Sequence, residues 1–197
     1  MNDVEHEWKP RILGLGGTTR QGSSSERALR AALDLAERAG ADTDLLLADD
    51  LDFPAYAPER GLHGPQADRL LDLVRRADGV IIASPGFHGG PSGLIKNALD
   101  YLEGLREEDR PYLDGRAIGC IVCAAGWQAT ATTLASLRST VHALRGWPTP
   151  VGVTINSTPV GDVDPIVAAA PQLGLLVDQV VGLARWQRAA ATVKVLS

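Results

Sequence analysis

The chain has 197 residues, which fits one domain large enough to bury a substantial core without disulfides or a structural metal. Hydrophobic residues make up 45% of the chain and charged residues 22%, so the composition indicates neither a disordered protein nor a membrane span. The formal net charge is −5 without any cluster of Lys and Arg. This argues against nucleic acid as a partner, because nucleic-acid binding rests largely on neutralising phosphates.

Residues 1–10 are predicted to form a flexible tail in front of a single domain over residues 11–197. The start of the tail is acidic and lacks the basic region and apolar run of a secretory signal. No apolar stretch of about twenty residues follows. We therefore expect a cytoplasmic protein with no membrane partner.

Apolar runs alternate with helical patterns along the whole chain, which is typical of βαβ units and a parallel sheet. The predicted strands lie near residues 11–16, 43–48, 79–84, 116–123 and 149–155. The predicted helices cover residues 26–39, 66–77, 92–105, 130–144 and 171–188. With right-handed crossovers these elements predict an α/β three-layer sandwich, a five-stranded parallel sheet in the order 2-1-3-4-5 with helices on both faces.

The first predicted strand runs into a loop, residues 17–25, that reads Gly-Thr-Thr-Arg-Gln-Gly-Ser-Ser-Ser and leads into a helix. Free backbone N–H groups and the positive end of the helix dipole meet at such a point, which suits a phosphate. Hydroxyls of Thr18, Ser23 and Ser25 and the guanidinium of Arg20 add donors. The alternative is a serine-capped helix after a flexible loop, but four polar side chains exceed what a cap requires.

This loop matches neither of the two common nucleotide-binding patterns. No Gly-Lys-Ser or Gly-Lys-Thr follows it, as a Walker loop would require, and a threonine occupies the third glycine position of a dinucleotide fingerprint.

Residues 49–65 form a long connection without clear periodicity between the second strand and the second helix. Long loops in compact domains often bind ligands or form interfaces, and we expect this one to contribute to a rim or a subunit contact.

A second loop of the same kind follows the apolar run 79–84, where residues 85–97 read Pro-Gly-Phe-His-Gly-Gly-Pro-Ser-Gly-Leu-Ile-Lys-Asn. A buried strand that ends in such a loop and restarts as a helix builds a ligand crevice at the carboxyl edge of an open α/β sheet. The glycines permit close approach of a flat ring, and Phe87 can supply an aromatic wall. In the alternative, Pro85 merely ends the strand and Ser92 caps the helix.

Three polar residues of this segment have less specific roles. His88 has no evident carboxylate partner in the sequence, so contact with a ligand and a solvent-facing loop position both stay open. Lys96 and Asn97 are expected to fix the loop or the helix start.

The fourth predicted strand contains Cys120 and Cys123, and the loop 124–128 follows it. Residues three apart on a strand point to opposite faces, which favours burial of both thiols over a shared metal or a disulfide. Trp127 in the loop can stack on a ligand or pack against a neighbouring loop or subunit. No metal-ligand spacing and no hydrolase elbow occur in the chain.

These loops resemble those of the NADPH-dependent FMN reductase family, flavodoxin-like proteins that include quinone and azo-dye reductases. The family's first loop, G-S-x-R-x-x-S-x-x, is matched by residues 17–25. Its second, S/T-P-x-Y-x-G-S-x-x-G-x-L-K-N-A-x-D, is matched by residues 84–89 and 93–100. The resemblance covers roughly residues 11–157 and implies a flavodoxin-like fold.

In the family the first loop binds the FMN phosphate and the second binds the edge of the isoalloxazine ring. Together with the third loop, the resemblance implies FMN contacts at Thr18, Arg20, Gly22, Ser23, Ser24, Ser25, Pro85, Gly86, Phe87, His88, Gly89, Ala125, Gly126 and Trp127. No catalytic side chain and no metal are expected, because the flavin carries the chemistry.

The chain departs from the family pattern at a few positions. Phe87 replaces the usual tyrosine, Gly86 replaces a larger residue, and residues 124–125 are both Ala where many relatives carry Gly or a hydroxyl residue. These departures concern the choice of substrate more than flavin binding.

The resemblance implies hydride transfer from NADPH or NADH to FMN and on to a small acceptor: free flavin, a quinone or an azo compound. A flavodoxin-like electron carrier without nicotinamide activity and a non-catalytic interaction domain are the alternatives. The resemblance also implies a homodimer or homotetramer with the flavin near the interface. A flavin-dependent monooxygenase is a further candidate partner.

Overall fold

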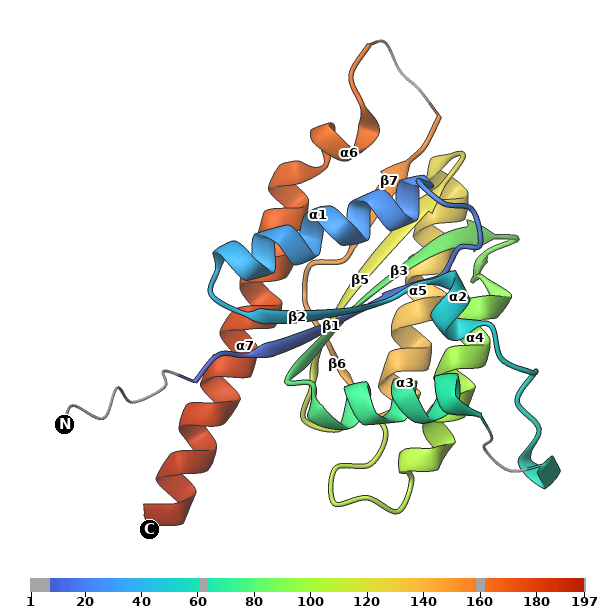
Figure 1. The fold of residues 1–197 in the computed structure, drawn as a ribbon. Coiled ribbons are helices and arrows are strands. Elements are labelled where there is room, and N and C mark those ends of the chain that lie inside the picture. The colour runs from blue at the N-terminus through green and yellow to red at the C-terminus, as the bar shows by residue number, and fades with distance from the viewer. Residues whose placement is uncertain (1–7, 61–63, 159–161, 197) are drawn as a thin grey trace.

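The computed structural model describes residues 8–60, 64–158 and 162–196 (Figure 1), so the predicted tail over 1–10 lies largely outside the described residues. The strands are β1 (Arg11–Gly16), β2 (Asp42–Leu46), β3 (Gly79–Phe87), β4 (Gly90–Pro91), β5 (Ala117–Ala124), β6 (Trp147–Pro148) and β7 (Val153–Asn156). The helices are α1 (Ser24–Arg38), α2 (Ala48–Leu51), α3 (Pro65–Arg76), α4 (Gly93–Asp100), α5 (Trp127–Ala143), α6 (Pro165–Ala168) and α7 (Ala170–Leu196), with 3₁₀ turns η1 (Pro58–Arg60) and η2 (Tyr101–Leu105).

The sheet runs in the order β2-β1-β3-β5, and both β6 and β7 pair with β5 at the outer edge. These pairings are parallel, whereas the short β4 runs antiparallel to β3. The predicted order 2-1-3-4-5 is confirmed, with the fifth position shared by two short strands.

The fifth strand, predicted as one element over 149–155, is divided into β6 and β7. Pro150 has no N–H to donate to a ladder. The N–H of Thr149 donates to the carbonyl of Ile118 at 3.0 Å, but that of Val151 donates to the side chain of Gln179 at 2.9 Å. The backbone therefore leaves the ladder after β6 and returns to it at β7.

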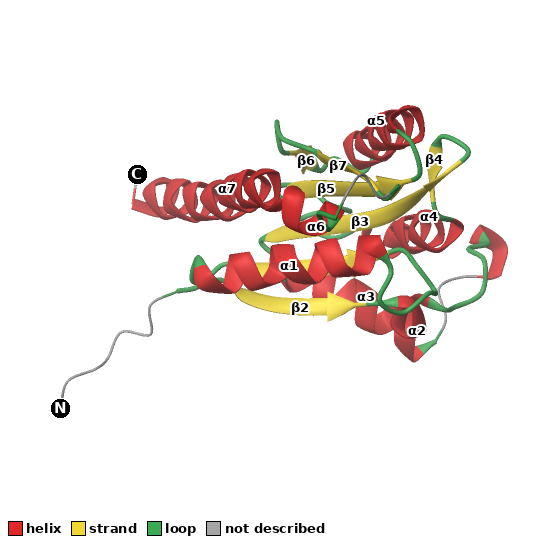
Figure 2. Ribbon diagram, turned by 90° about the horizontal axis from the view of Figure 1, so that it is seen from above, coloured by secondary structure: helices red, strands yellow, loops and turns green. Residues whose placement is uncertain are grey.

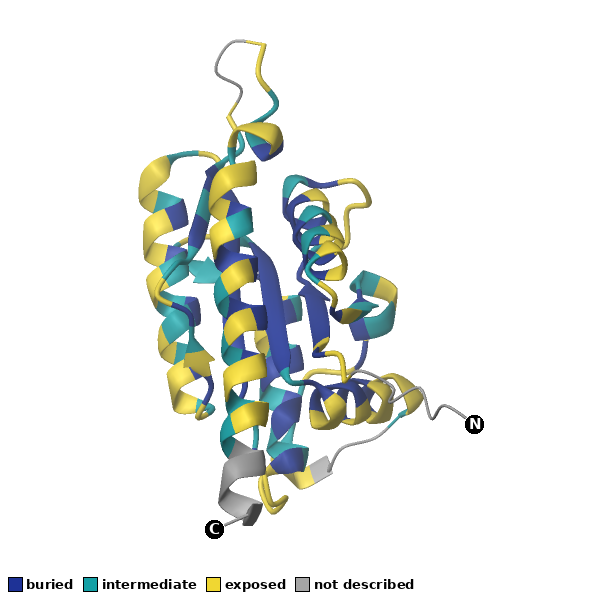
Figure 3. Cartoon of the chain, turned by 90° about the vertical axis from the view of Figure 1, so that its left-hand side faces the viewer, coloured by how far each residue is buried: buried dark blue, intermediate teal, exposed yellow. Residues whose placement is uncertain are grey.

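Helices cover both faces of the sheet (Figure 2). On β3, Val80 and Ile82 join a cluster with α3, α4 and α5, whereas Ile81 and Ala83 join a cluster with α1, α6 and α7. This alternation is the two-residue period of a strand buried on both faces. The three-layer α/β sandwich is thereby confirmed, and Figure 3 shows the strands buried between helices whose outer sides are exposed.

The two cysteines follow the same alternation. Cys120 packs in the α3–α5 cluster and Cys123 in the α1–α7 cluster, and both are buried free thiols. This confirms the prediction that they lie on opposite faces.

Several helix boundaries differ from the prediction. The helix expected over 130–144 begins at Trp127, and the helix expected over 92–105 divides into α4 and the turn η2. The helix expected over 171–188 is part of the longer α7, and α6 was not predicted. Within the described ranges, no helix combines the length and hydropathy that a membrane crossing requires.

Asn97 of α4 fixes part of the long connection 49–65. Its side-chain amide donates to the carbonyls of Phe53 at 3.2 Å and Pro54 at 3.1 Å, and its Oδ1 accepts from the N–H of Tyr56 at 2.7 Å. Asn97 therefore fixes this connection, whereas the prediction assigned it to the second loop or the helix start. Lys96 instead pairs with Asp100 one turn away, at 2.6 Å.

Arg116, at the start of β5, is the largest fully buried side chain, with 1% exposure. Its guanidinium donates to main-chain carbonyls, among them those of Val74, Arg75 and Ala77 at the end of α3, over 2.9–3.2 Å. The negative end of the helix dipole therefore faces this cation. Burial lowers the pKa of Arg116 to about 10.

Replacing Arg116 with Met should lower the free energy of unfolding by about 3 kcal/mol, because several buried carbonyls would lose their donor. Urea unfolding measures the loss. Arg110→Met is the control, since this exposed arginine donates to a single carbonyl, that of Gly115. Equal unfolding midpoints for the two variants would contradict a structural role for the buried guanidinium.

Burial raises the pKa of Cys120 and of Cys123 to about 12, from an ordinary value of 9.0. The unfolded chain thus releases thiol protons at lower pH than the folded chain, so the thiols make the free energy of unfolding fall as pH rises from about 9 toward about 12. Ellman's reagent near neutral pH should label neither thiol in the native protein and both in urea. The double variant Cys120→Ala/Cys123→Ala should lose this part of the alkaline decline, and fast labelling of a native thiol would contradict the assignment.

Candidate functional site

The carboxyl ends of β1, β3 and β5 open at the same edge of the sheet, because these strands are parallel neighbours. The first loop contacts β3 directly, since the N–H of Gly17 donates to the carbonyl of Ala83 at 2.8 Å. A Cβ at Gly17 would lie 2.3 Å from Cγ1 of Ile95, so only glycine lets this loop lie against the start of α4. The structure therefore brings the predicted loops together.

Within the first loop, Ser23 is the N-cap of α1. Its hydroxyl accepts from the N–H of Glu26 at 3.3 Å, and the hydroxyl of Ser25 lies 3.3 Å from it. Both serines are buried. The hydroxyl of Ser23 therefore caps α1, as the alternative interpretation expected.

Glu26 of α1 contacts the first loop, although it was not among the predicted site residues. Its carboxylate accepts from the N–H of Gly22 at 2.9 Å and from Nε of Arg30 at 2.9 Å. The pattern Ser23-x-x-Glu26 is that of a capping box, and it could have predicted the role of Glu26 from the sequence. One consequence is that the N–H of Gly22 already has a partner.

Other donors at the start of α1 stay available to an anion. In the described part of the chain, the N–H groups of Ser24 and Ser25 make no hydrogen bond. The hydroxyl of Thr18 accepts from the N–H of Arg20 at 3.2 Å, and the Arg20 residue is exposed. Free N–H groups at the positive end of a 15-residue helix, beside a hydroxyl and a guanidinium, fit a phosphate monoester.

The second loop is a β-hairpin. β3 does not end at Pro85 but continues to Phe87, which pairs with Gly90 of β4 across a two-residue turn. His88 and Gly89 in this turn have φ of 52° and 85°, the left-handed region that such turns require. Phe87 is 58% exposed beside the turn.

The start of α4 and the position of Gly86 tie the hairpin to its neighbours. Ser92 caps α4 by accepting from the N–H of Ile95 at 3.2 Å, as predicted. A Cβ at Gly86 would lie 2.8 Å from the hydroxyl of Thr133, so the close packing at this glycine is against α5.

The third loop is shorter than predicted, because Trp127 and Gln128 are the first residues of α5. The N–H of Gly126 donates to Oδ1 of Asn156 at 3.0 Å, and the same oxygen accepts from the N–H of Thr158 at 3.0 Å. Asn156, at the end of β7, is a second positioning residue that the sequence reading missed.

The start of α5 carries no side-chain cap, since Gly126 with φ of 100° occupies the N-cap position. Within the described residues, the N–H groups of residues 127–129 make no hydrogen bond. The N-terminus of this 17-residue helix therefore presents free donors and a positive dipole end.

A groove of about 570 Å³ lies between the hairpin and the start of α5. It is lined by His88, Gly89, Ala125, Gly126, Trp127, Gln128, Ala129 and Thr132. Five of the predicted contact residues thus share one groove, whereas those of the first loop and residues 85–87 lie outside its lining. Among the described residues, His, Cys, Asp and Glu form no group of three that could hold a metal ion.

Comparison with known proteins identifies the family. The protein family described as NADPH-dependent FMN reductase matches residues 10–159. The chain is 29% identical to the NAD(P)H-dependent FMN reductase PA1204 of Pseudomonas aeruginosa, over 66% of this chain and 69% of that protein. It is 27% identical to an NADPH azoreductase of Bacillus sp. (strain OY1-2), over 56% of this chain and 60% of that protein. The matched segments leave about a third or more of each relative uncovered.

Solved structures share the fold at lower identity. The apo form of the NADH:FMN oxidoreductase EMOB has a TM-score of 0.65 and 22% identity, covering 86% of this chain and 87% of that one. The NAD(P)H:(acceptor) oxidoreductase FerB of Paracoccus denitrificans has a TM-score of 0.69 and 20% identity, covering 91% and 98%. A flavodoxin, WrbA-like protein of Agrobacterium tumefaciens covers 91% of this chain at a TM-score of 0.65 and 15% identity, and 99% of that chain. The flavodoxin-like architecture is thereby confirmed.

Proposed function

This chain belongs to the NADPH-dependent FMN reductase family, and on that premise we propose that it binds FMN and passes hydride from NADPH or NADH through the flavin to a small acceptor. Free flavin, a quinone or an azo compound is the proposed acceptor. The family match over residues 10–159 includes the three loops at the carboxyl edge of the sheet.

The first loop is suited to the phosphate end of FMN. The unpaired N–H groups of Ser24 and Ser25 and the exposed Arg20 supply donors and positive charge at the start of α1. Thr18 adds a hydroxyl, whereas Gly22 contributes no free N–H because Glu26 accepts from it. The buried Ser23 hydroxyl serves the helix cap, so its proposed role is to shape the loop.

The groove is suited to the ring end of FMN. When bound, FMN supplies the hydride chemistry, and the protein holds it in place. Gly126 cannot lend its N–H to a ring oxygen, because that donor is bonded to Asn156. The free N–H groups of residues 127–129 take over this role, and the dipole of α5 favours the negative charge that a flavin gains on reduction.

One observation carries the proposal: two helices, α1 and α5, begin at the same sheet edge with unpaired N–H groups, one on each side of the β3–β4 hairpin. A ligand with a phosphate at one end and an anion-forming ring at the other satisfies both helix starts. Pro85, Gly86 and Phe87 then support the hairpin, while His88, Gly89, Ala125 and Trp127 border the ring.

We extend the proposal to a cytoplasmic homodimer or homotetramer, with residues 11–197 as one domain. Phe87 is 58% exposed beside the turn of the hairpin, which favours a second subunit as its cover. A flavin-dependent monooxygenase is the proposed recipient if reduced FMN leaves the protein.

Arg20→Glu should raise the Kd for FMN about tenfold or more, because it reverses the charge beside the phosphate. The Kd for riboflavin, which has no phosphate, should stay unchanged. Arg38→Glu, at the exposed far end of α1, is the matched control. Titration of flavin fluorescence measures both constants, and equal FMN affinity in the Arg20 and Arg38 variants would contradict the phosphate site.

Anaerobic addition of NADPH to the FMN-loaded protein should bleach the flavin absorbance, and a quinone should restore it. Bleaching requires hydride transfer from the nicotinamide, whereas a flavodoxin-like electron carrier would bind FMN and stay yellow. A protein without affinity for FMN would contradict both functions and favour a non-catalytic interaction domain.

A further inference from the structure

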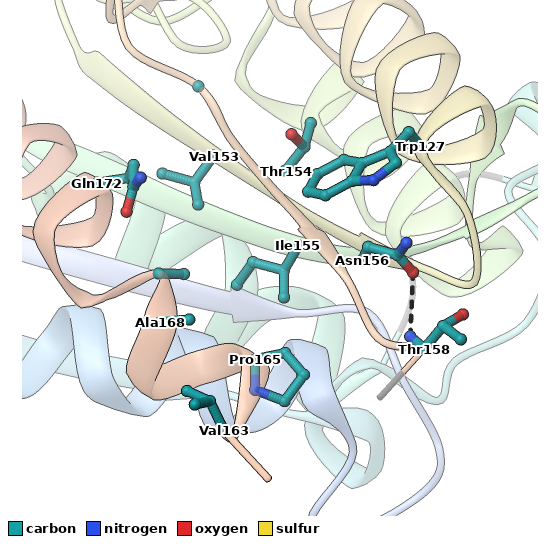
Figure 4. Close-up of a pocket in the computed structure, with 12 residues that line it drawn as sticks. Trp127, Val153, Thr154, Ile155, Asn156, Thr158, Val163, Pro165, Ala168 and Gln172 are labelled. Atoms are coloured by element: carbon teal, nitrogen blue, oxygen red, sulfur yellow. Dashed lines mark hydrogen bonds between the residues drawn. The ribbon is translucent and has the colours of Figure 1, made fainter. Parts of the chain in front are cut away.

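A second cavity, of about 430 Å³, lies on the α6 side of Trp127, between β7, α6 and the start of α7 (Figure 4). Its walls are mainly apolar and include Val153, Ile155, Val163, Pro165, Ala168 and Ala169. The volume falls within the range of small-molecule sites. The proposed flavin groove does not include this cavity.

None of the described residues that line this cavity carries a charge. The nearby carboxylate of Asp164 is engaged, because it pairs with Arg27 and accepts from the N–H of Ile166 at 2.8 Å. The hydrogen bond from Arg27 lowers the pKa of Asp164, so this pair stays ionic. An anion or a cation in the cavity would lose water without gaining a partner of opposite charge, so the matching ligand is neutral.

The polar groups of the cavity lining are also uncharged, namely the amides of Asn156 and Gln172 and the hydroxyls of Thr154 and Thr158. Oδ1 of Asn156 already accepts two N–H groups, from Gly126 and Thr158. Its Nδ2 is therefore the group left to address a ligand, and it is a donor. The matching ligand group is an acceptor such as a carbonyl oxygen.

Trp127 lines both the cavity and the groove. Its indole is 65% exposed, and Figure 4 shows it near Thr154 and Asn156, over β7. A large aromatic face beside apolar walls gains most from a flat aromatic partner.

We propose that this cavity is a separate binding site for a neutral aromatic carbonyl compound, which stacks on Trp127 and accepts from Asn156. The site stands independently of the proposed flavin function. A ligand in the cavity and a ligand in the groove would both border Trp127.

The test uses Trp127 as the reporter. The chain has four tryptophans, so the triple variant Trp8→Phe/Trp147→Phe/Trp186→Phe leaves Trp127 alone. Titration of this FMN-free protein with menadione, a neutral aromatic diketone that quenches indole fluorescence, should give saturable quenching. Quenching that never saturates would overturn the proposal.

A pair of exposed valines provides a matched test of the cavity. Val163 and Val167 are 60% and 67% exposed, but only Val163 lines the cavity. In the single-tryptophan protein, Val163→Asp should weaken menadione binding about tenfold, because the ligand would desolvate a carboxylate, and Val167→Asp should leave it unchanged. Ala168→Phe, which fills the cavity without adding charge, should also weaken binding.

Unchanged affinity in both Val163→Asp and Ala168→Phe would overturn the cavity site, because menadione would then be bound elsewhere against Trp127. FMN titration of the same variants keeps the two proposals apart. Absence of FMN binding in the parent protein would contradict the flavin function. The menadione titrations test the cavity site separately.

Discussion

The proposed two-ended site depends on the close approach of the first loop to the start of α4. The N–H of Gly17 donates to Ala83 at the end of β3, and the missing side chain lets the loop lie against Ile95. Because β1, β3 and β5 are parallel neighbours, this contact sets the start of α1 at the same edge as the hairpin and the start of α5. A bulkier residue at position 17 would separate the two helix starts on which the proposed function rests.

The strands that carry this edge could be predicted because their burial is encoded locally. Both faces of β3 are covered by helices, so consecutive residues such as Ile81 and Ile82 are apolar, and this run predicts a buried strand. The preference for right-handed crossovers then gives the strand order. The hairpin could not be predicted from the same signal. It requires a positive φ at His88, a non-glycine residue, and a pairing of Phe87 with Gly90 that only the folded chain reveals.

In the site too, contacts between residues close in sequence could be predicted, whereas contacts between distant residues could not. The capping by Ser23 and the engagement of Glu26 follow from a four-residue pattern that the sequence contains. Asn156 lies 30 residues from the Gly126 N–H that it binds, and no local pattern indicates this contact. That contact decides which donors the third loop can offer, because it engages the N–H of Gly126 and leaves those of residues 127–129 free.

The interruption between β6 and β7 also protects the outer edge of the sheet. A continuous strand there would present a row of unpaired N–H and C=O groups to any other extended chain, a common start of aggregation. Pro148 and Pro150 remove two donors from that row, and the break shortens what remains. At the opposite edge, β2 carries Asp42 and Asp44, whose negative charges discourage strand addition. Both borders of the sheet are thus closed to edge-to-edge growth by ordinary side-chain chemistry.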